Sequence, residues 1–167
     1  MEVAVRKDIM LHAYMFTQSG LPIIYSGDEV GQVNDYTYKD DPEKAEDSRY
    51  IHRGAFDWEL ARNVDEPGTV QQRIFSALDE LEGIRRTEPV FSAEAEVRTE
   101  ECGDTSILRI VRRAGDAELH AAFNFSDVAK TVEMPEAAPC TDLLTGETSE
   151  EGTVRLPAWG FTWMLRG

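Results

Sequence analysis

A single apolar run, Leu21–Ser26, constrains the fold of this chain more than any other feature. It follows a segment, residues 3–19, that reads as a helix with apolar residues almost all round, and Gly20 is a good helix stop between the two. A short apolar run bounded by glycine is typical of a buried parallel strand. Because a parallel strand needs parallel neighbours and the sequence offers none, we expect the α/β unit to be the end of a larger sheet from a longer protein.

The segment after this run is long and polar, and it has no sustained period. It extends from Asp28 to about Pro67, with a possible helical turn at Asp57–Arg62. Loops of this length are usually functional or disordered, and disordered segments are poor in aromatic residues. We therefore predict an ordered loop, because its aromatic residues are Tyr36, Tyr38, Tyr50, Phe56 and Trp58.

A second helix is predicted at about residues 70–86, where apolar residues recur at spacings of three and four. Thr69, followed by Gln72, has the pattern of a capping box at its start. Pro89 follows the helix, so we place the domain boundary there and expect two domains, residues 1–88 and 89–167.

The second domain has the period of β-strands. From Phe91 onward apolar and polar residues alternate in short segments, separated by turn signals such as Gly103-Asp104 and Gly115-Asp116. This pattern predicts an antiparallel β-sandwich. The expected strands are residues 94–100, 105–113, 117–125, 129–134, 140–145, 152–156 and 159–165.

Composition excludes several classes of function. A net charge of −15, from 17 basic and 32 acidic side chains, disfavours nucleic acid and anionic membrane surfaces as partners. No apolar run is long enough to span a membrane, and we find no signal peptide. Cys102 and Cys140 look like ordinary thiols of a reducing compartment, which favours a cytoplasmic protein, although one bridge between them stays open. No Cys/His cluster has the spacing of metal ligands, and we expect neither a metal nor another cofactor.

Three stretches of the chain together resemble the alpha-amylase family, glycoside hydrolase family 13. They are GLPIIYSGDEVGQVND at 20–35, DSRYIHRGAFDW at 47–58, and DLLTGE with RLPAWGFTWML in the last domain. Within the family the sequence is most like the amylosucrases, which carry a similar Asp-Ser-Arg segment. The resemblance implies the last β/α unit of a TIM (β/α)₈ barrel followed by an antiparallel β-sandwich C-terminal domain.

The resemblance also implies that the catalytic groups lie outside this chain. Members of the family use three carboxylates after the fourth, fifth and seventh barrel strands, and no part of the chain matches those segments. We therefore assign no catalytic residue and expect the chain alone to be inactive. Asp28 and Glu29 are adjacent and point to opposite sides, so they are poorly placed to flank one bond about 5–5.5 Å apart. We interpret both as structural loop anchors, with a direct ligand contact as the alternative.

Arg49 is the strongest candidate for substrate binding. In amylosucrases the arginine of this segment pairs with an aspartate of the first barrel loop and closes the bottom of the glucose pocket. The alternative is a loop arginine paired with Asp47 or Glu46. His52 and Arg53 are further candidates for contact with the sugar.

Aromatic residues leave a second alternative open. Trp58 and Tyr50 either stack on sugar rings or form the loop's own small core. Trp159 and Trp163, around the last predicted strand, either form a carbohydrate platform or bury the second domain and seal it against the barrel.

The sequence thus predicts a fragment of a sucrose-using, retaining α-glucosyltransferase that acts on sucrose and α-glucans. One alternative is a fragment of an α-glucosidase or sucrose hydrolase, and another is a non-catalytic carbohydrate- or partner-binding module. We expect either the remaining barrel segment or self-association to cover apolar residues that a lone unit would expose. Those residues are Met10, Met15, Phe16, Ile23 and Ile24.

Overall fold

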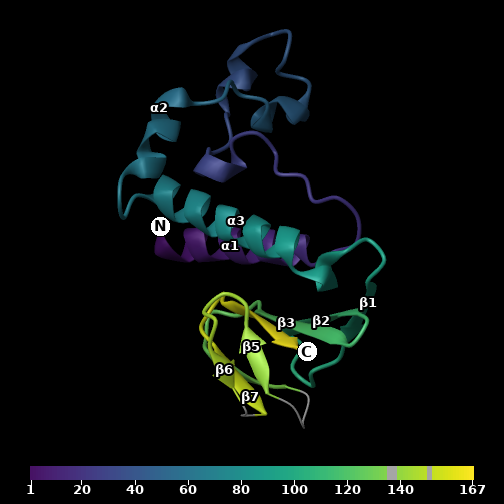
Figure 1. Cartoon of the computed structure of the whole chain (residues 1–167). Coiled ribbons are helices and arrows are strands. Elements are labelled where there is room, and N and C mark those ends of the chain that lie inside the picture. Colours follow the sequence, from purple (N-terminus) through teal and green to yellow (C-terminus); the bar gives the residue numbers. More distant parts are fainter. Residues whose placement is uncertain (135–138, 150–151) are drawn as a thin grey trace. The chain divides into compact units, whose positions relative to one another are not determined.

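The computed structural model describes residues 1–134, 139–149 and 152–167 (Figure 1). The chain divides into two compact units. Unit 1 comprises Met1–Pro22 and Ala77–Gly167, and unit 2 comprises Ile23–Ser76. The predicted domains, residues 1–88 and 89–167, stay a prediction.

Two helices contribute to unit 1. Helix α1 spans Glu2–Phe16, and the second half of helix α3, Val70–Thr87, lies beside it (Figure 1). Helix α1 ends three residues before the predicted residue 19, and the Thr17 hydroxyl donates a hydrogen bond to the Tyr14 carbonyl at 2.7 Å there. At the start of α3 the Thr69 hydroxyl accepts from the Gln72 backbone N–H at 3.1 Å, which is the first half of the predicted capping box.

The strands of unit 1 form two antiparallel sheets, which confirms the predicted β-sandwich. The larger sheet has the order β1-β2-β3-β8-β5-β6, and the smaller one pairs β4 with β7. Two residues connect β2 to β3, whose register runs without interruption from Ile107 opposite Asn124 to Ala114 opposite Ala117. Strand β6 was not expected from the sequence. The bounds are β1 Glu96–Glu100, β2 Ile107–Ala114, β3 Ala117–Asn124, β4 Lys130–Glu133, β5 Cys140–Asp142, β6 Thr148–Ser149, β7 Thr153–Leu156 and β8 Phe161–Arg166.

Both faces of the larger sheet are covered in the described part of unit 1. On one face Ala122 and Met164 pack in a cluster with residues of the smaller sheet. The other face packs against α1, where Tyr14 meets Phe123 edge-on with ring centroids 5.8 Å apart. The expectation that Met10 and Phe16 lack partners is therefore wrong, because each is 1% exposed in this layer. Trp163 is fully buried, as expected if it serves packing.

Arg112 joins the helices to the sheet. Its side chain on β2 is 1% exposed, and its guanidinium donates to four backbone carbonyls. Two belong to Thr17 and Gln18, at 2.9 and 3.3 Å, just past the end of α1. The other two, Val90 at 2.6 Å and Ser92 at 2.9 Å, belong to the 3-10 helix η5, Pro89–Phe91, and the residue after it. Arg112 thus supplies donors to carbonyls at the C-terminal end of α1, where a positive charge also suits the helix dipole.

Unit 2 is built from short helical turns without a described strand. The predicted turn at 57–62 is confirmed as helix α2, Trp58–Ala61. Asp57 caps it by accepting from the Glu59 and Leu60 backbone N–H groups at 3.0 and 2.9 Å. The 3-10 helices are η1 Asp28–Val30, η2 Thr37–Asp40, η3 Ser48–His52 and η4 Arg62–Asp65.

The predicted strand Leu21–Ser26 is wrong for this chain. The segment is not assigned to a strand, and Leu21 and Ile23 are 91% and 79% exposed. The reason is that a strand forms only beside another strand, and the described residues supply no neighbour here. Cys102 and Cys140 do not form a disulfide with each other.

Candidate functional site

The loop of unit 2 begins with a tight turn at Gly27–Gly31. The Gly27 backbone N–H donates to the Glu29 carboxylate at 2.8 Å, so this acid is engaged in its own turn. Gly31 has a φ of 63°, and a Cβ atom there would lie 2.7 Å from Cδ1 of Ile74 on α3. Only glycine therefore lets the turn sit this close to the helix.

Gln32 ties this turn to the second half of the loop. Its side-chain amide donates to the Ala55 carbonyl at 2.9 Å and accepts from the Asp57 backbone N–H at 3.0 Å. Both ends of one neutral side chain thus hold residues more than twenty positions away. Sequence reasoning missed this residue, because a single glutamine in a polar loop carries no distinguishing pattern.

A small hollow lies between the two segments that Gln32 joins. Asp28 and His52 both line it, together with Tyr25 and Asp35, and its volume is about 50 Å³. That is far below the roughly 300–1,000 Å³ of small-molecule sites, so unit 2 alone does not enclose a sugar ring. Glu29, Arg49 and Arg53 are not among its lining residues.

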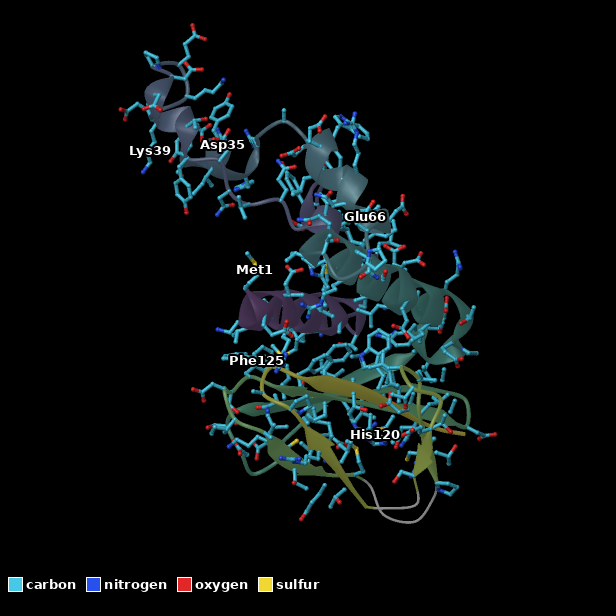
Figure 2. The ribbon with its side chains drawn as sticks, turned by 90° about the vertical axis from the view of Figure 1, so that its left-hand side faces the viewer. Met1, Asp35, Lys39, Glu66, His120 and Phe125 are labelled. Atoms are coloured by element: carbon cyan, nitrogen blue, oxygen red, sulfur yellow. The ribbon has the colours of Figure 1, made fainter. Side chains whose placement is uncertain are left out.

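Asp35, labelled in Figure 2, lies two residues before the 3-10 helix η2 and is held by contacts with its first residue. Its carboxylate accepts from the Thr37 hydroxyl at 2.6 Å and from the Thr37 backbone N–H at 2.8 Å, and these bonds lower its pKa. Its own backbone N–H donates to the Ile51 carbonyl at 2.7 Å. The bond places the segment that carries His52 against the start of the loop.

Arg49 is paired with Asp47, which was the alternative to substrate binding. Its Nε lies 2.8 and 3.0 Å from the two carboxylate oxygens, and Nη2 lies 2.7 Å from the second. These bonds lower the pKa of Asp47 to about 2. The Arg49 side chain is nevertheless 69% exposed, and Nη1 has no partner in the described residues.

His52 and Arg53 are exposed and contact aromatic rings. The His52 ring meets the Tyr25 ring edge-on, with centroids 5.9 Å apart and an interplanar angle of 83°. The Arg53 guanidinium lies 5.7 Å from the centroid of the Tyr50 ring. The structure thus places Tyr50 in a cation–π contact, and it leaves Trp58 73% exposed.

A buried ionic cluster in the sheet also escaped sequence reasoning. Glu118 on β3 is 3% exposed and pairs with Arg113, with Arg166 at 3.0 Å and with Nε2 of His120 at 2.8 Å. Burial raises the pKa of Glu118, but the bonds from Arg113 and His120 outweigh it and the net shift is downward. His120, labelled among the strands in Figure 2, has a lowered pKa because it is buried.

Two further observations concern the described residues only. No group of three His, Cys, Asp or Glu side chains in residues 1–134, 139–149 and 152–167 is arranged to hold a metal ion. No helix in the same ranges is both long and apolar enough to cross a membrane.

One family model matches part of the second half of the chain. Residues 92–163 match the family "Domain of unknown function (DUF3459)". These residues contain most of the larger sheet and both strands of the smaller one. The family description assigns no activity.

Solved structures extend the likeness to nearly the whole chain. AmyP in complex with maltose is 16% identical, with a TM-score of 0.75 over 96% of this chain. The trehalulose synthase MutB from Pseudomonas mesoacidophila MX-45 is 17% identical, with a TM-score of 0.69 over 96%, and a MutB mutant is known in complex with the substrate sucrose. The maltogenic amylase from S. marinus is 18% identical, with a TM-score of 0.65 over 95%.

The chain spans only part of each of these proteins. It covers 34% of AmyP, 38% of MutB and 19% of the maltogenic amylase. At such low identity the likeness shows the fold alone. The chain therefore has the fold of the part of these alpha-amylase family enzymes, glycoside hydrolase family 13, that includes their C-terminal antiparallel β-sheet domain.

Proposed function

We propose that this chain is the C-terminal part of a retaining, sucrose-using α-glucosyltransferase that resembles the amylosucrases and acts on sucrose and α-glucans. In this proposal residues 1–88 complete a (β/α)₈ barrel and residues 89–167 form the C-terminal domain. The catalytic carboxylates lie in the remaining barrel segment, so the chain alone is inactive. The longer protein is cytoplasmic.

The geometry of Arg49 supports this proposal more than any other observation. A guanidinium has two edges that can each bind a carboxylate with a pair of hydrogen bonds. Asp47 occupies the edge formed by Nε and Nη2, which leaves Nη1 and the second Nη2 hydrogen facing away from it. Asp47 therefore orients Arg49 and does not block it. The free edge is suited to a carboxylate of the remaining barrel, as the amylosucrase resemblance implies.

The loop as a whole is organised to present this segment. The bond from Asp35 to Ile51 and the bond from Gln32 to Ala55 hold the two ends of the stretch that contains His52 and Arg53, and Arg49 lies two residues before this stretch. The small hollow lined by Asp28, Asp35 and His52 needs a further wall before it can enclose a glucosyl ring. In our proposal the remaining barrel supplies that wall, and Asp28 and Glu29 act as loop anchors.

A second candidate is a hydrolase of α-glucans. The likeness to the maltogenic amylase and to AmyP with maltose is comparable to the likeness to MutB, and this observation favours a glucan as the substrate of the longer protein. Sucrose is favoured by the Asp47-Ser48-Arg49 segment and by the sucrose complex of the MutB mutant. The two candidates differ in the product, because a transferase places glucose on a glucan and a hydrolase releases it.

The test uses the longer protein that contains this chain, supplied with sucrose with and without a maltooligosaccharide acceptor. We expect released fructose, with glucose appearing in longer glucans. Arg49→Ala should raise KM for sucrose at least tenfold, because it removes a carboxylate-pairing group. Arg62→Ala is the matched control, since Arg62 also forms an exposed ion pair, with Glu59 at 2.8 Å.

Three results would overturn the proposal. The first is fructose release by the 167-residue chain alone at the rate of the longer protein. The second is a longer protein that ignores sucrose but cleaves starch, which would favour the hydrolase. The third is an Arg49→Ala variant whose KM for sucrose equals that of the Arg62→Ala control.

A further inference from the structure

A second hollow lies within unit 1, between the start of α1 and the turn that leads into β8. Its volume is about 280 Å³, close to the lower end of the roughly 300–1,000 Å³ of small-molecule sites. Most of its surface is apolar, and Arg6 is the charged residue in its lining. It is lined by Arg6, Ile9, Pro157, Trp159, Gly160 and Phe161.

The turn that presents Trp159 is fixed by its surroundings. A Cβ atom on Gly160 would lie 2.5 Å from Cγ of Pro157, so the chain can pass this closely only with glycine. Asn124, which is fully buried, donates to the Pro157 carbonyl at 2.8 Å. The Trp159 backbone N–H donates to the Ser126 carbonyl at 3.0 Å. The indole therefore projects from a rigid support.

Trp159 itself adopts a strained backbone conformation. Among the residues that the structure describes, it is the only non-glycine residue with a positive φ, at 54°. Bulky side chains rarely adopt this conformation, and glycine would do so without strain. Such strain clusters at binding sites, where the surrounding structure enforces it. Packing alone does not account for Trp159, because its side chain remains partly exposed, unlike the fully buried Trp163.

The groups around the indole match the chemistry of a sugar. An apolar floor of Ile9 and Trp159 suits the C–H face of a pyranose ring. Arg6 lines the hollow, so its guanidinium can donate to hydroxyl oxygens. The ammonium of Lys7 lies 3.9 Å from the centroid of the indole and covers one face of that ring, but Lys7 does not line the hollow. No carboxylate lines the hollow, and the net charge of −15 disfavours an anionic ligand.

We propose that this hollow is a binding site for an α-glucan, in which one glucosyl ring stacks on the face of Trp159 that Lys7 does not cover and its hydroxyl groups accept from Arg6. The choice of an α-glucan rests on the proposed function. The site would hold the polymer through unit 1 alone, so it does not depend on how the loop of unit 2 completes its pocket.

The test is a calorimetric titration of the 167-residue chain with maltoheptaose. Trp159→Gly removes the indole and relieves the strained φ, so it does not threaten the fold, which far-UV circular dichroism verifies. We expect the wild-type chain to bind and Trp159→Gly to lower the affinity at least tenfold. Phe75→Ala removes an aromatic residue of α3 that is 42% exposed, and it should leave the affinity unchanged.

Equal binding by wild type and Trp159→Gly would overturn the inference, as would the absence of binding by the wild-type chain. A loss of self-association in Trp159→Gly by light scattering, without maltoheptaose binding by the wild type, would assign the hollow to a second copy of the chain instead. The proposed function fails separately. If the longer protein ignores sucrose while the hollow binds maltoheptaose, only the sucrose assignment is lost.

Discussion

Replacing Arg112 should weaken the contact between the helices of unit 1 and its sheet and lower the free energy of unfolding. The side chain is 1% exposed and donates to four carbonyls, of Thr17, Gln18, Val90 and Ser92. Arg112→Ala leaves these carbonyls without that donor. The bonds to Val90 and Thr17 lie in a buried environment, and each orphaned buried group costs about 1–3 kcal/mol. The two partly buried bonds add less, so we expect a loss of about 3–6 kcal/mol.

This loss is large relative to the roughly 5–15 kcal/mol that stabilises a typical domain. At about 2–4 °C per kcal/mol for a chain of this size, Tm should fall by about 6–24 °C. Urea unfolding followed by circular dichroism measures the free energy directly. Arg112→Met keeps most of the side-chain volume and tests whether packing alone suffices, while Arg62→Ala, at a side chain that is 73% exposed, should cost under about 0.5 kcal/mol. A loss below about 1 kcal/mol in Arg112→Ala would refute the reasoning.

Three other predictions follow from the contacts of single residues. Burial of His120 lowers its pKa below the unfolded value, so the folded chain takes up fewer protons and loses stability as the pH falls below about 6.5. Between pH 7.5 and 5.5 the unfolding free energy should therefore drop less in His120→Asn than in the wild type, by on the order of 1 kcal/mol. Equal drops in the two proteins would contradict this. The lowered pKa of Glu118 adds acid sensitivity of the same sign at lower pH. Gly31→Ala forces a Cβ to within 2.7 Å of the Ile74 side chain at a positive φ, so urea unfolding should show a loss of about 1–3 kcal/mol, whereas an unchanged midpoint would show that the turn is free to move. Gln32→Ala should speed hydrogen exchange at the Asp57 amide at least tenfold without altering exchange in β3, and uniform exchange changes would argue against a local clip.

Local signals were enough to predict most of the regular elements of unit 1. Turn residues mark the ends of its strands, although β3 is buried along nearly its whole length because both faces of the larger sheet are covered, and α3 carries an apolar stripe. The turn at 57–62 could be predicted because Asp57 caps its own next residues. The pairing of Arg49 with Asp47 could be foreseen as an alternative for the same reason, since the partners are two residues apart.

What escaped prediction depends on partners that are distant in the sequence. An arginine at position 112 of an alternating strand gives no sign that its donors meet a helix end 95 residues earlier. The sequence around Gln32 gives no sign of its hydrogen bonds either, because its partners lie 23 and 25 residues away. For Leu21–Ser26 the opposite error occurred, because a strand was predicted that the structure does not contain. Its composition suits a strand, but strand formation requires neighbours that the described residues do not supply.

The two-residue connection between β2 and β3 has a consequence for the order of folding. These strands pair along eight residues each, across Gly115 and Asp116, so their contacts close short loops and can form within about 1–10 μs. β8 must then return across more than thirty residues to pair with β3, and the end of α1 meets Arg112 only across 95 residues. We therefore expect the β2–β3 hairpin to form the folding nucleus, with α1 docking after the transition state. Mutations in α1 would then mainly accelerate unfolding, whereas mutations in the hairpin would slow folding.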